Sequence, residues 1–221
     1  MTIRFLTLGC KLNFAESSHI GRLLYAQGHT RARQGEPADI CIINTCSVTD
    51  TADQKDRQAI HRLRRENPNA ILIVTGCYAQ LQPETISNMP EVDYVLGQDE
   101  KFSIAELLKR IDQQAKVQAS AIRECDTYHS AWSKDDRTRC FLKVQDGCNY
   151  FCTYCTIPLA RGKSRNGSIA TIVEQAREAI VSGSKEIVLT GVNIGDFGRS
   201  TGERFIDLLR ALDTIETTSA D

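Results

Sequence analysis

Three cysteines lie close enough together in one short stretch to bind the same metal centre. Cys148, Cys152 and Cys155 form the pattern C-x-x-x-C-x-x-C. Three thiolates in one loop can bind three irons of a cubane cluster and leave the fourth iron open, whereas electron-transfer clusters usually have four cysteine ligands. The alternative is a structural zinc site with a distant fourth ligand, for which Cys140 and His129 are the candidates. The spacing favours the cluster, because zinc-binding cysteines usually come as two C-x-x-C pairs.

A further set of cysteines follows three separate apolar runs: Cys10, Cys46 and Cys77. Each of them comes just after the carboxyl end of a predicted parallel strand and just before helix-forming sequence. If the strand order is flavodoxin-like, with the first strand between the second and the third, these ends share one edge and the sulfurs converge. Helix N-termini at that edge would favour thiolate. We therefore predict a second metal site, the alternative being three small buried residues in tight turns.

The elements that must position these cysteines can be predicted from alternating strand and helix patterns in the first part of the chain. Continuous apolar runs rich in β-branched residues alternate with amphipathic segments, which is typical of a parallel sheet covered on both faces. We expect strands at Ile3–Leu8, Asp39–Asn44, Ala70–Thr75 and Val92–Leu96, and helices at Phe14–Ala26, Asp50–Glu66, Pro83–Asn88 and Lys101–Ile111. The predicted fold class is α/β, with a flavodoxin-like parallel sheet domain over residues 1–115.

The rest of the chain is predicted to form a second domain. Residues 116–137 show little periodicity and are interpreted as a linker, and the α/β pattern resumes over residues 138–221. We expect strands at Cys140–Gln145 and Glu186–Leu189, helices at Ile169–Ser182 and Arg204–Leu212, and a glycine-rich loop at Gly191–Gly202.

Composition excludes several classes of protein. The chain has 221 residues, of which 41% are hydrophobic and 25% charged, as in folded soluble proteins. Its apolar runs are too short to span a bilayer, and its N-terminus lacks the features of a signal peptide, so we expect a cytoplasmic protein with no membrane partner. The net charge of −1 predicts no global attraction to nucleic acid, so any such contact must be local.

The cysteine count is nine, and an odd number excludes a complete disulfide framework. Beyond the two sets, the remaining cysteines are interpreted as thiols of the core, the linker and a strand, without a ligand role: Cys41, Cys125 and Cys140. The histidines show no metal-binding spacing and are interpreted as surface or core residues: His19, His29, His61 and His129.

The sequence around the cysteine loop resembles the radical S-adenosylmethionine (SAM) superfamily, and its flanks resemble the methylthiotransferases. The flanks read FLKVQDGCNYFCTYC from Phe141 and IPLARGKSR from Ile157. The resemblance implies a radical SAM (β/α) barrel after the N-terminal domain. It also implies that Cys148, Cys152 and Cys155 hold a catalytic [4Fe–4S] cluster whose open iron binds SAM. An external one-electron reductant is needed to cleave SAM to methionine and a 5′-deoxyadenosyl radical.

The same resemblance implies a second, auxiliary [4Fe–4S] cluster on Cys10, Cys46 and Cys77. It also implies that the glycine-rich loop helps to bind SAM, although an ordinary turn after a strand looks the same. The residues predicted to contact SAM are Gly191, Val192, Asn193 and Tyr154.

The predicted substrate is a tRNA. The stretch GCKLNFAES from Gly9 resembles the branch that transfers a methylthio group to carbon 2 of N6-threonylcarbamoyladenosine beside the anticodon. The alternatives are isopentenyladenosine in tRNA, a ribosomal protein, or a catalytically incomplete iron–sulfur or zinc fragment. A basic run beside the cysteine loop is predicted to contact RNA phosphates: Arg161, Lys163 and Arg165. A second run is interpreted as a solvated helix face: Lys55, Arg57, Arg62, Arg64 and Arg65.

Family members usually continue well beyond two βα units and complete the barrel. The chain is therefore expected to contain only the start of the radical SAM domain, truncated at its C-terminal side. No obligate protein partner is inferred.

Overall fold

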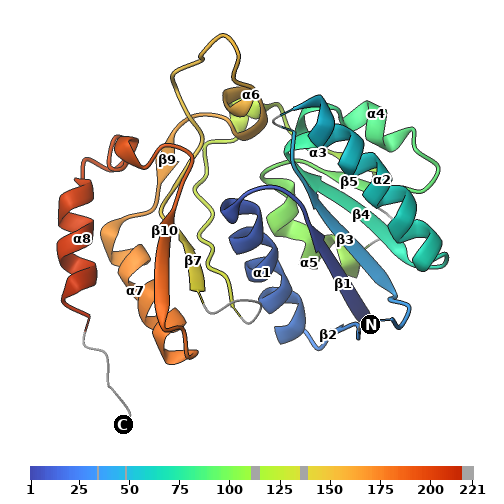
Figure 1. The fold of residues 1–221 in the computed structure, drawn as a ribbon, viewed down its shortest axis with the longest axis horizontal. Helices are drawn as coiled ribbons and strands as arrows, with labels where there is room; N and C mark the ends of the chain where they lie inside the picture. Colours follow the sequence, from blue (N-terminus) through green and yellow to red (C-terminus); the bar gives the residue numbers. More distant parts are fainter. Residues whose placement is uncertain (34, 48, 111–114, 135–138, 216–221) are drawn as a thin grey trace.

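The computed structural model describes residues 1–33, 35–47, 49–110, 115–134 and 139–215. Its N-terminal part is one parallel sheet of six strands in the order β2-β1-β3-β4-β5-β6 (Figure 1). These strands are β1 (Thr2–Thr7), β2 (Thr30–Arg31), β3 (Ile40–Thr45), β4 (Ile71–Gly76), β5 (Tyr94–Leu96) and β6 (Val117–Gln118). The α/β class is confirmed.

The strand order corrects one step of the sequence analysis. The order is flavodoxin-like only because a short strand, β2, pairs with the outer edge of β1. That strand was not predicted, since two exposed residues carry no hydrophobic pattern. The strand predicted as the second is therefore the third, β3, and it lies between β1 and β4. The three cysteine-bearing strands remain neighbours, with the strand of Cys46 in the middle rather than that of Cys10.

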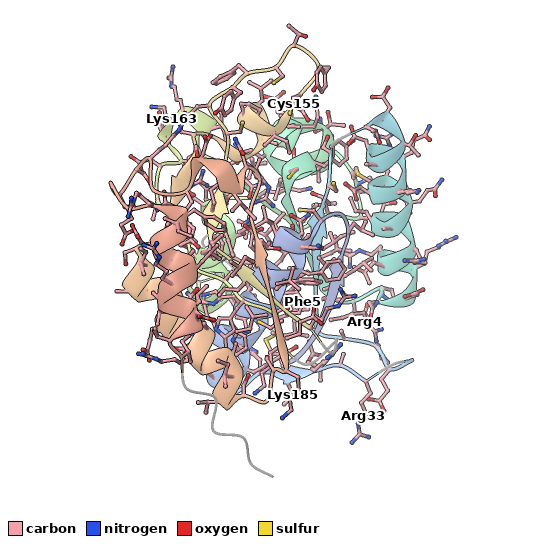
Figure 2. All side chains as sticks on the ribbon, turned by 60° about the vertical axis from the view of Figure 1, so that its left-hand side comes forward. Arg4, Phe5, Arg33, Cys155, Lys163 and Lys185 are labelled. Carbon is pink, nitrogen blue, oxygen red and sulfur yellow. The ribbon has the colours of Figure 1, made fainter. Side chains whose placement is uncertain are left out.

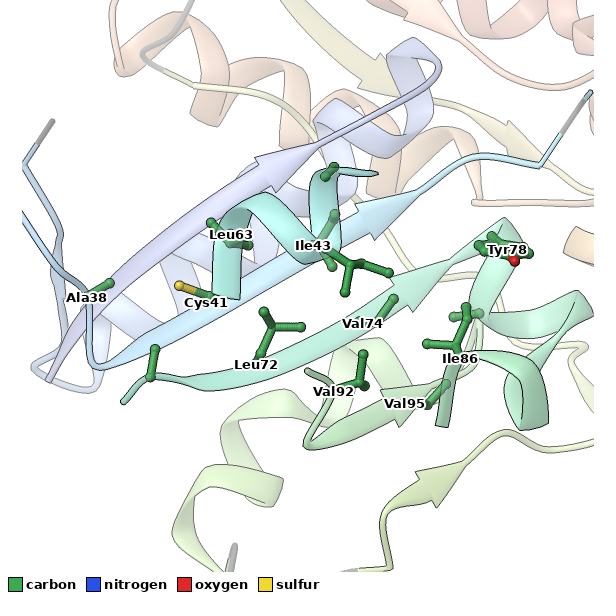
Figure 3. Packing of buried hydrophobic residues seen from close by; sticks show 14 residues of the cluster. Ala38, Cys41, Ile43, Leu63, Leu72, Val74, Tyr78, Ile86, Val92 and Val95 are labelled. Atoms are coloured by element: carbon green, nitrogen blue, oxygen red, sulfur yellow. The ribbon is translucent and has the colours of Figure 1, made fainter. Parts of the chain in front are cut away.

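Two layers of helices cover the sheet, because β3 is apolar on both faces. Ile40 and Ile42 point to one face, and Cys41 and Ile43 point to the other, as expected for alternating side chains of a strand. Helices α2 (Asp50–Glu66), α3 (Cys77–Leu81) and α4 (Pro83–Ser87) cover the face of Cys41, whose packing is shown in Figure 3. Helices α1 (Lys11–Ala26) and α5 (Ile104–Lys109) cover the other, and α5 follows the 3-10 helix η1 (Glu100–Ser103). Cys41 is thus a core thiol, as predicted.

The second part has its own small core around two parallel strands, β7 (Arg139–Lys143) and β10 (Glu186–Thr190). Helices α7 (Ile169–Val181) and α8 (Phe205–Asp213) pack on one face, where Cys140 and Leu142 are buried. The carboxyl end of β7 leads into a two-stranded antiparallel ribbon and a short helix: β8 (Gln145–Asp146), β9 (Arg165–Asn166) and α6 (Ile157–Arg161).

The two parts are packed together along α1 and β7. Phe141 of β7 contacts Ala15 of α1 in a small shared apolar cluster. Part of the predicted linker joins this interface. Trp132 of the linker forms a β-bridge with Leu142, and the guanidinium of Arg22 lies 3.7 Å from the centroid of the Trp132 ring. Strand β6 is also part of the linker and extends the N-terminal sheet by pairing with β5. The linker positions 135–137 lie outside the described residues. No helix in the described parts of the chain has the length and apolarity required for a membrane span.

Candidate functional site

The first cysteine set lies along the carboxyl edge of the N-terminal sheet. Cys10 is the N-cap of α1, Cys46 directly follows β3, and Cys77 is the first residue of α3. Gly9 makes the close approach possible, because a Cβ atom added to it would lie 2.6 Å from the Cβ of Cys46 and its φ is +95°. The structure therefore brings to one edge three residues that are far apart in the sequence.

Two amides that the sequence analysis missed hold this edge together. Asn13 donates from Nδ2 to the carbonyl oxygens of Leu8 (2.8 Å) and Thr45 (2.9 Å), which lie just before Cys10 and Cys46. Gln98 donates from Nε2 to the sulfur of Cys77 at 3.6 Å. The only signal for Asn13 in the sequence was its place one turn after Cys10, and Gln98 had none.

Burial sets the protonation of Cys77 in the metal-free chain. The sequence analysis expected helix N-termini to favour thiolate, but α3 has only five residues. Burial raises the pKa of the Cys77 thiol, against the lowering effect of the nearby Arg161 and Lys101. A bound metal would therefore have to displace the proton of this thiol.

Asp56 supports the same edge and gives a prediction for pH dependence. Its buried carboxylate accepts a hydrogen bond from the backbone N–H of Cys46 at 3.0 Å, and burial raises its pKa from 3.8 to about 7. Because the pKa is higher in the folded state, the unfolded chain loses this proton first as pH rises. Ionisation of Asp56 is thus expected to cost stability progressively between about pH 4 and about pH 7.

The variant Asp56→Asn is expected to remove this part of the pH dependence while keeping an oxygen that can accept the Cys46 bond. Urea unfolding of metal-free protein across that range measures it. The exposed Asp213→Asn is the matched control and is expected to follow the wild-type profile. A wild-type profile retained in Asp56→Asn would contradict the assignment.

The second cysteine set lies on the loop between β8 and α6. Cys152 is exposed, and Cys148 and Cys155 are half-buried. The loop starts at Gly147 (φ +67°), where an added Cβ would lie 2.0 Å from the carbonyl oxygen of Lys163. It is tied back by a hydrogen bond from Cys148 N–H to the carbonyl of Gly162 at 3.0 Å. The three thiols are thus held by one loop whose base is rigid.

The predicted SAM-binding loop lies next to the base of the cysteine loop. Gln145 connects them, since its Oε1 accepts from Asn193 N–H at 2.8 Å and its Nε2 donates to the carbonyl of Gly147 at 2.8 Å. A Cβ atom added to Gly191 would lie 3.0 Å from Oε1 of Gln145, which is a tight contact. Val192 is half-buried, and Tyr154 is 90% exposed. Gln145 is a further residue that the sequence analysis did not single out.

The two cysteine sets face each other across the interface between the two parts. Helix α3, which starts at Cys77, packs against α6, which follows Cys155 (Figure 1). Thr156 donates from Oγ1 to the carbonyl oxygen of Ser47 at 3.1 Å, so the residue after Cys155 contacts the residue after Cys46. Figure 2 places Cys155 and Lys163 at one end of the molecule, opposite Arg4 and Lys185.

A buried network of ion pairs fills the same interface. Its two carboxylates and four cations come from both parts of the chain: Glu16, Asp146, Lys101, Lys143, Arg161 and Arg165. Burial raises the pKa of Glu16, but Arg161, Lys101 and Lys143 outweigh it and hold that pKa far below its ordinary range. The network is therefore ionised and paired.

The network changes how the basic run beside the cysteine loop is to be interpreted. The sequence analysis predicted a phosphate contact for all three residues, but Arg161 and Arg165 are buried and bound to Asp146. Lys163 is exposed. On α2, Arg64 donates to the carbonyls of Ala70 and Glu91, whereas the exposed cations of that run are Lys55, Arg62 and Arg65.

The donor sets suit two clusters better than zinc. Cys140 lies in the core near the amino end of β7, and His129 pairs with Asp99 at 3.4 Å, so neither is placed as a fourth zinc ligand. Within the described residues, no three side chains of His, Cys, Asp or Glu lie close enough together to bind a single metal ion. Thiolates of a cubane each bind a different iron and so do not need that grouping. Each set offers three soft thiol donors, one set at the sheet edge and the other on one loop, which fits a [4Fe–4S] cluster at each.

Comparison with known families confirms the resemblance. Residues 2–97 match the uncharacterized protein family UPF0004, and residues 142–217 match the radical SAM superfamily. The chain thus combines a UPF0004 domain with a radical SAM domain, which supports its resemblance to the radical SAM methylthiotransferases. SAM and [4Fe–4S] clusters are the cofactors of such proteins.

Relatives of known name match nearly the whole chain. The threonylcarbamoyladenosine tRNA methylthiotransferase MtaB of Bacillus subtilis is 41% identical over 96% of this chain and 48% of that protein. The threonylcarbamoyladenosine tRNA methylthiotransferase MtaB of Thermotoga maritima is 38% identical over 97% of this chain and 49% of that protein. The tRNA-2-methylthio-N(6)-dimethylallyladenosine synthase of Desulfotalea psychrophila is 33% identical over 95% of this chain and 51% of that protein. The chain thus spans about half the length of the curated relatives it matches.

Solved structures confirm the fold. The radical SAM methyltransferase TsrM of Kitasatospora setae, with cobalamin and a [4Fe–4S] cluster bound, superimposes with a TM-score of 0.58 at 12% identity. The superposition covers 95% of this chain and 51% of that one. The predicted partial radical SAM fold after an α/β domain is confirmed.

Proposed function

We propose that this chain carries the two cluster sites of a tRNA methylthiotransferase. Cys148, Cys152 and Cys155 hold the [4Fe–4S] cluster that binds SAM, and Cys10, Cys46 and Cys77 hold the auxiliary cluster. The observation that carries the proposal is the meeting of the two sets at the Thr156–Ser47 contact. Each set also has three cysteines, whereas electron-transfer clusters usually have four cysteine ligands.

The residues of this chain have distinct parts in that reaction. When bound, the cluster on Cys148, Cys152 and Cys155 supplies the reductive cleavage of SAM, for which an external one-electron donor is needed. Gly191, Val192 and Asn193 form the wall beside the cysteine loop against which SAM is held, and Gln145 keeps that wall in place. Tyr154 is 90% exposed, and we assign it to cover SAM or a base from the solvent side. A carbon radical is needed to activate the C–H bond of the substrate. Water must be excluded from the site so that this reactive species is not lost to side reactions.

The proposed substrate is tRNA carrying N6-threonylcarbamoyladenosine, with methylthiolation at carbon 2. MtaB relatives with 41% and 36% identity support this branch, and the relative named tRNA-2-methylthio-N(6)-dimethylallyladenosine synthase is 33% identical. The test uses two tRNAs without a methylthio group at carbon 2, one carrying N6-threonylcarbamoyladenosine and one carrying dimethylallyladenosine. Incubation with each tRNA, followed by mass spectrometry of its nucleosides, shows which substrate is methylthiolated. Methylthiolation of the dimethylallyl tRNA alone would contradict the proposed branch.

Anaerobic reconstitution tests the cluster assignment. Wild-type protein is expected to bind about eight irons with matching sulfide, since it has two cubane sites. The triple variant Cys148→Ala/Cys152→Ala/Cys155→Ala is expected to bind about four irons and to release no 5′-deoxyadenosine from SAM. The triple variant Cys10→Ala/Cys46→Ala/Cys77→Ala is expected to bind about four and to keep SAM cleavage.

The control is Cys125→Ala, which removes a buried thiol outside both sets and is expected to keep both clusters. One equivalent of zinc in place of iron would contradict both cluster sites. Two clusters without SAM cleavage would favour the alternative of a catalytically incomplete iron–sulfur fragment.

A further inference from the structure

The side chain of Arg161 contacts both parts of the chain at once. Its guanidinium donates to Asn13 Oδ1 at 2.5 Å and to Glu16 Oε1 at 3.2 Å on α1, and to Asp146 Oδ1 at 2.9 Å on β8. It is 1% exposed, so water does not compete for these bonds. One planar group therefore joins α1 to the strand before the cysteine loop.

On the N-terminal side, this contact leads directly to the first cysteine set. The oxygen of the Asn13 amide accepts from Arg161, while its nitrogen donates to the carbonyls of Leu8 and Thr45. The guanidinium thus orients an amide that ties together the strand ends before Cys10 and Cys46.

On the other side, the contact leads to the second set. The Asp146 oxygen that accepts from Arg161 also accepts from Gly147 N–H at 2.8 Å, directly before Cys148. Gly162, the residue after Arg161, accepts the hydrogen bond from Cys148 N–H. The backbone on both sides of the loop base is therefore fixed by Arg161 and its neighbour.

We propose that Arg161 is a positioning residue that fixes the first cysteine set relative to the second. This inference rests on the proposed function, because it gives the interface the task of setting the separation between two clusters. Arginine suits the task, since its rigid fork reaches acceptors on two elements, whereas a lysine ammonium is a single point charge. The sequence analysis had assigned this residue to RNA phosphate, which its burial does not allow.

Arg161→Lys tests the geometry while keeping the charge. The matched control is Arg165→Lys, another buried arginine. Its partners are the Asp146 carboxylate and the carbonyl oxygens of Thr127, Arg161 and Lys163, and none of these lies on α1. The first readout is hydrogen exchange of metal-free protein. In Arg161→Lys, exchange is expected to rise by about tenfold in both segments 8–14 and 146–150, since each loses a buried charged hydrogen bond. In Arg165→Lys it is expected to rise only in the second segment.

The second readout is the magnetic coupling between the two reduced clusters in the EPR spectrum of fully loaded protein. Loss or change of the coupling in Arg161→Lys at unchanged iron content, with wild-type coupling in Arg165→Lys, supports the inference. Wild-type coupling in Arg161→Lys, or faster exchange confined to one segment, overturns it. If wild-type protein binds no second cluster, the proposed function fails, and the exchange pattern still decides whether Arg161 links the two segments.

Discussion

Replacing Glu16 with alanine is expected to lower the free energy of unfolding by about 3–5 kcal/mol, which is the usual cost of removing one partner from a buried ion pair. Glu16 is fully buried and pairs with Lys101 at 2.7 Å, Lys143 at 2.9 Å and Arg161 at 3.2 Å. Without it, Asp146 is the only carboxylate left against four buried cations. Lys101 is affected most, because its remaining acceptor in the network is the amide oxygen of Gln98.

Urea unfolding of metal-free protein at neutral pH measures this loss. Glu36→Ala is the matched control, because Glu36 is a surface carboxylate, 4.0 Å from Arg33, and its removal is expected to cost less than about 1 kcal/mol. The double variant Glu16→Met/Lys101→Met is expected to recover part of the stability, since it no longer leaves Lys101 unpaired. Equal stability of Glu16→Ala and Glu36→Ala would show that the network contributes nothing at this interface.

Replacing Gly147 with alanine is expected to disrupt the base of the second cysteine loop. The added methyl group would lie 2.0 Å from the carbonyl oxygen of Lys163 and 2.6 Å from that of Gly162, and neither backbone atom can rotate away. The positive φ of +67° adds a cost of about 1–2 kcal/mol for any residue with a Cβ. We expect a total loss of at least about 3 kcal/mol, or local opening of the loop, because overpacking adds its own penalty.

Gly183→Ala separates the backbone cost of a positive φ from the cost of the steric overlap. Gly183 has a φ of +98° and nothing within 4 Å of an added Cβ, so this variant carries only the backbone cost. Urea unfolding compares stability, and iron content after reconstitution reports the loop. We expect Gly147→Ala to lose the iron of the second set and Gly183→Ala to keep both clusters. Full iron loading of Gly147→Ala would refute the close crossing at this glycine.

Much of the local structure could be predicted because it depends on short-range patterns. Apolar runs such as Ile40–Ile43 define buried strands, and Asn67-Pro68 ends α2 at Glu66, as the structure has it. The cysteine loop could be identified from spacing alone, since all three thiols lie on one continuous segment. Conversely, β2 has two residues and could not be found, although it decides which strand neighbours β1.

The partners of charged residues could not be predicted from their spacing. Arg161, Lys163 and Arg165 look alike as a basic run, yet two of them are buried and one is exposed. The difference arises because Glu16, far away in the sequence, lies beside Arg161 only after α1 has packed against β7. Asn13 and Gln145 were missed for the same reason, since each acts by joining two distant segments.

The sequence by itself determined the donor chemistry: two sets of three thiols, one on a single loop and one at the ends of three predicted strands. It also determined the α/β class, because burial on both faces of a sheet requires continuous apolar runs. The tertiary structure alone decided which strand lies in the middle, that the two sets meet at one interface, and that buried ion pairs join them. Those features depend on contacts between segments far apart in the chain, and no local pattern encodes such contacts.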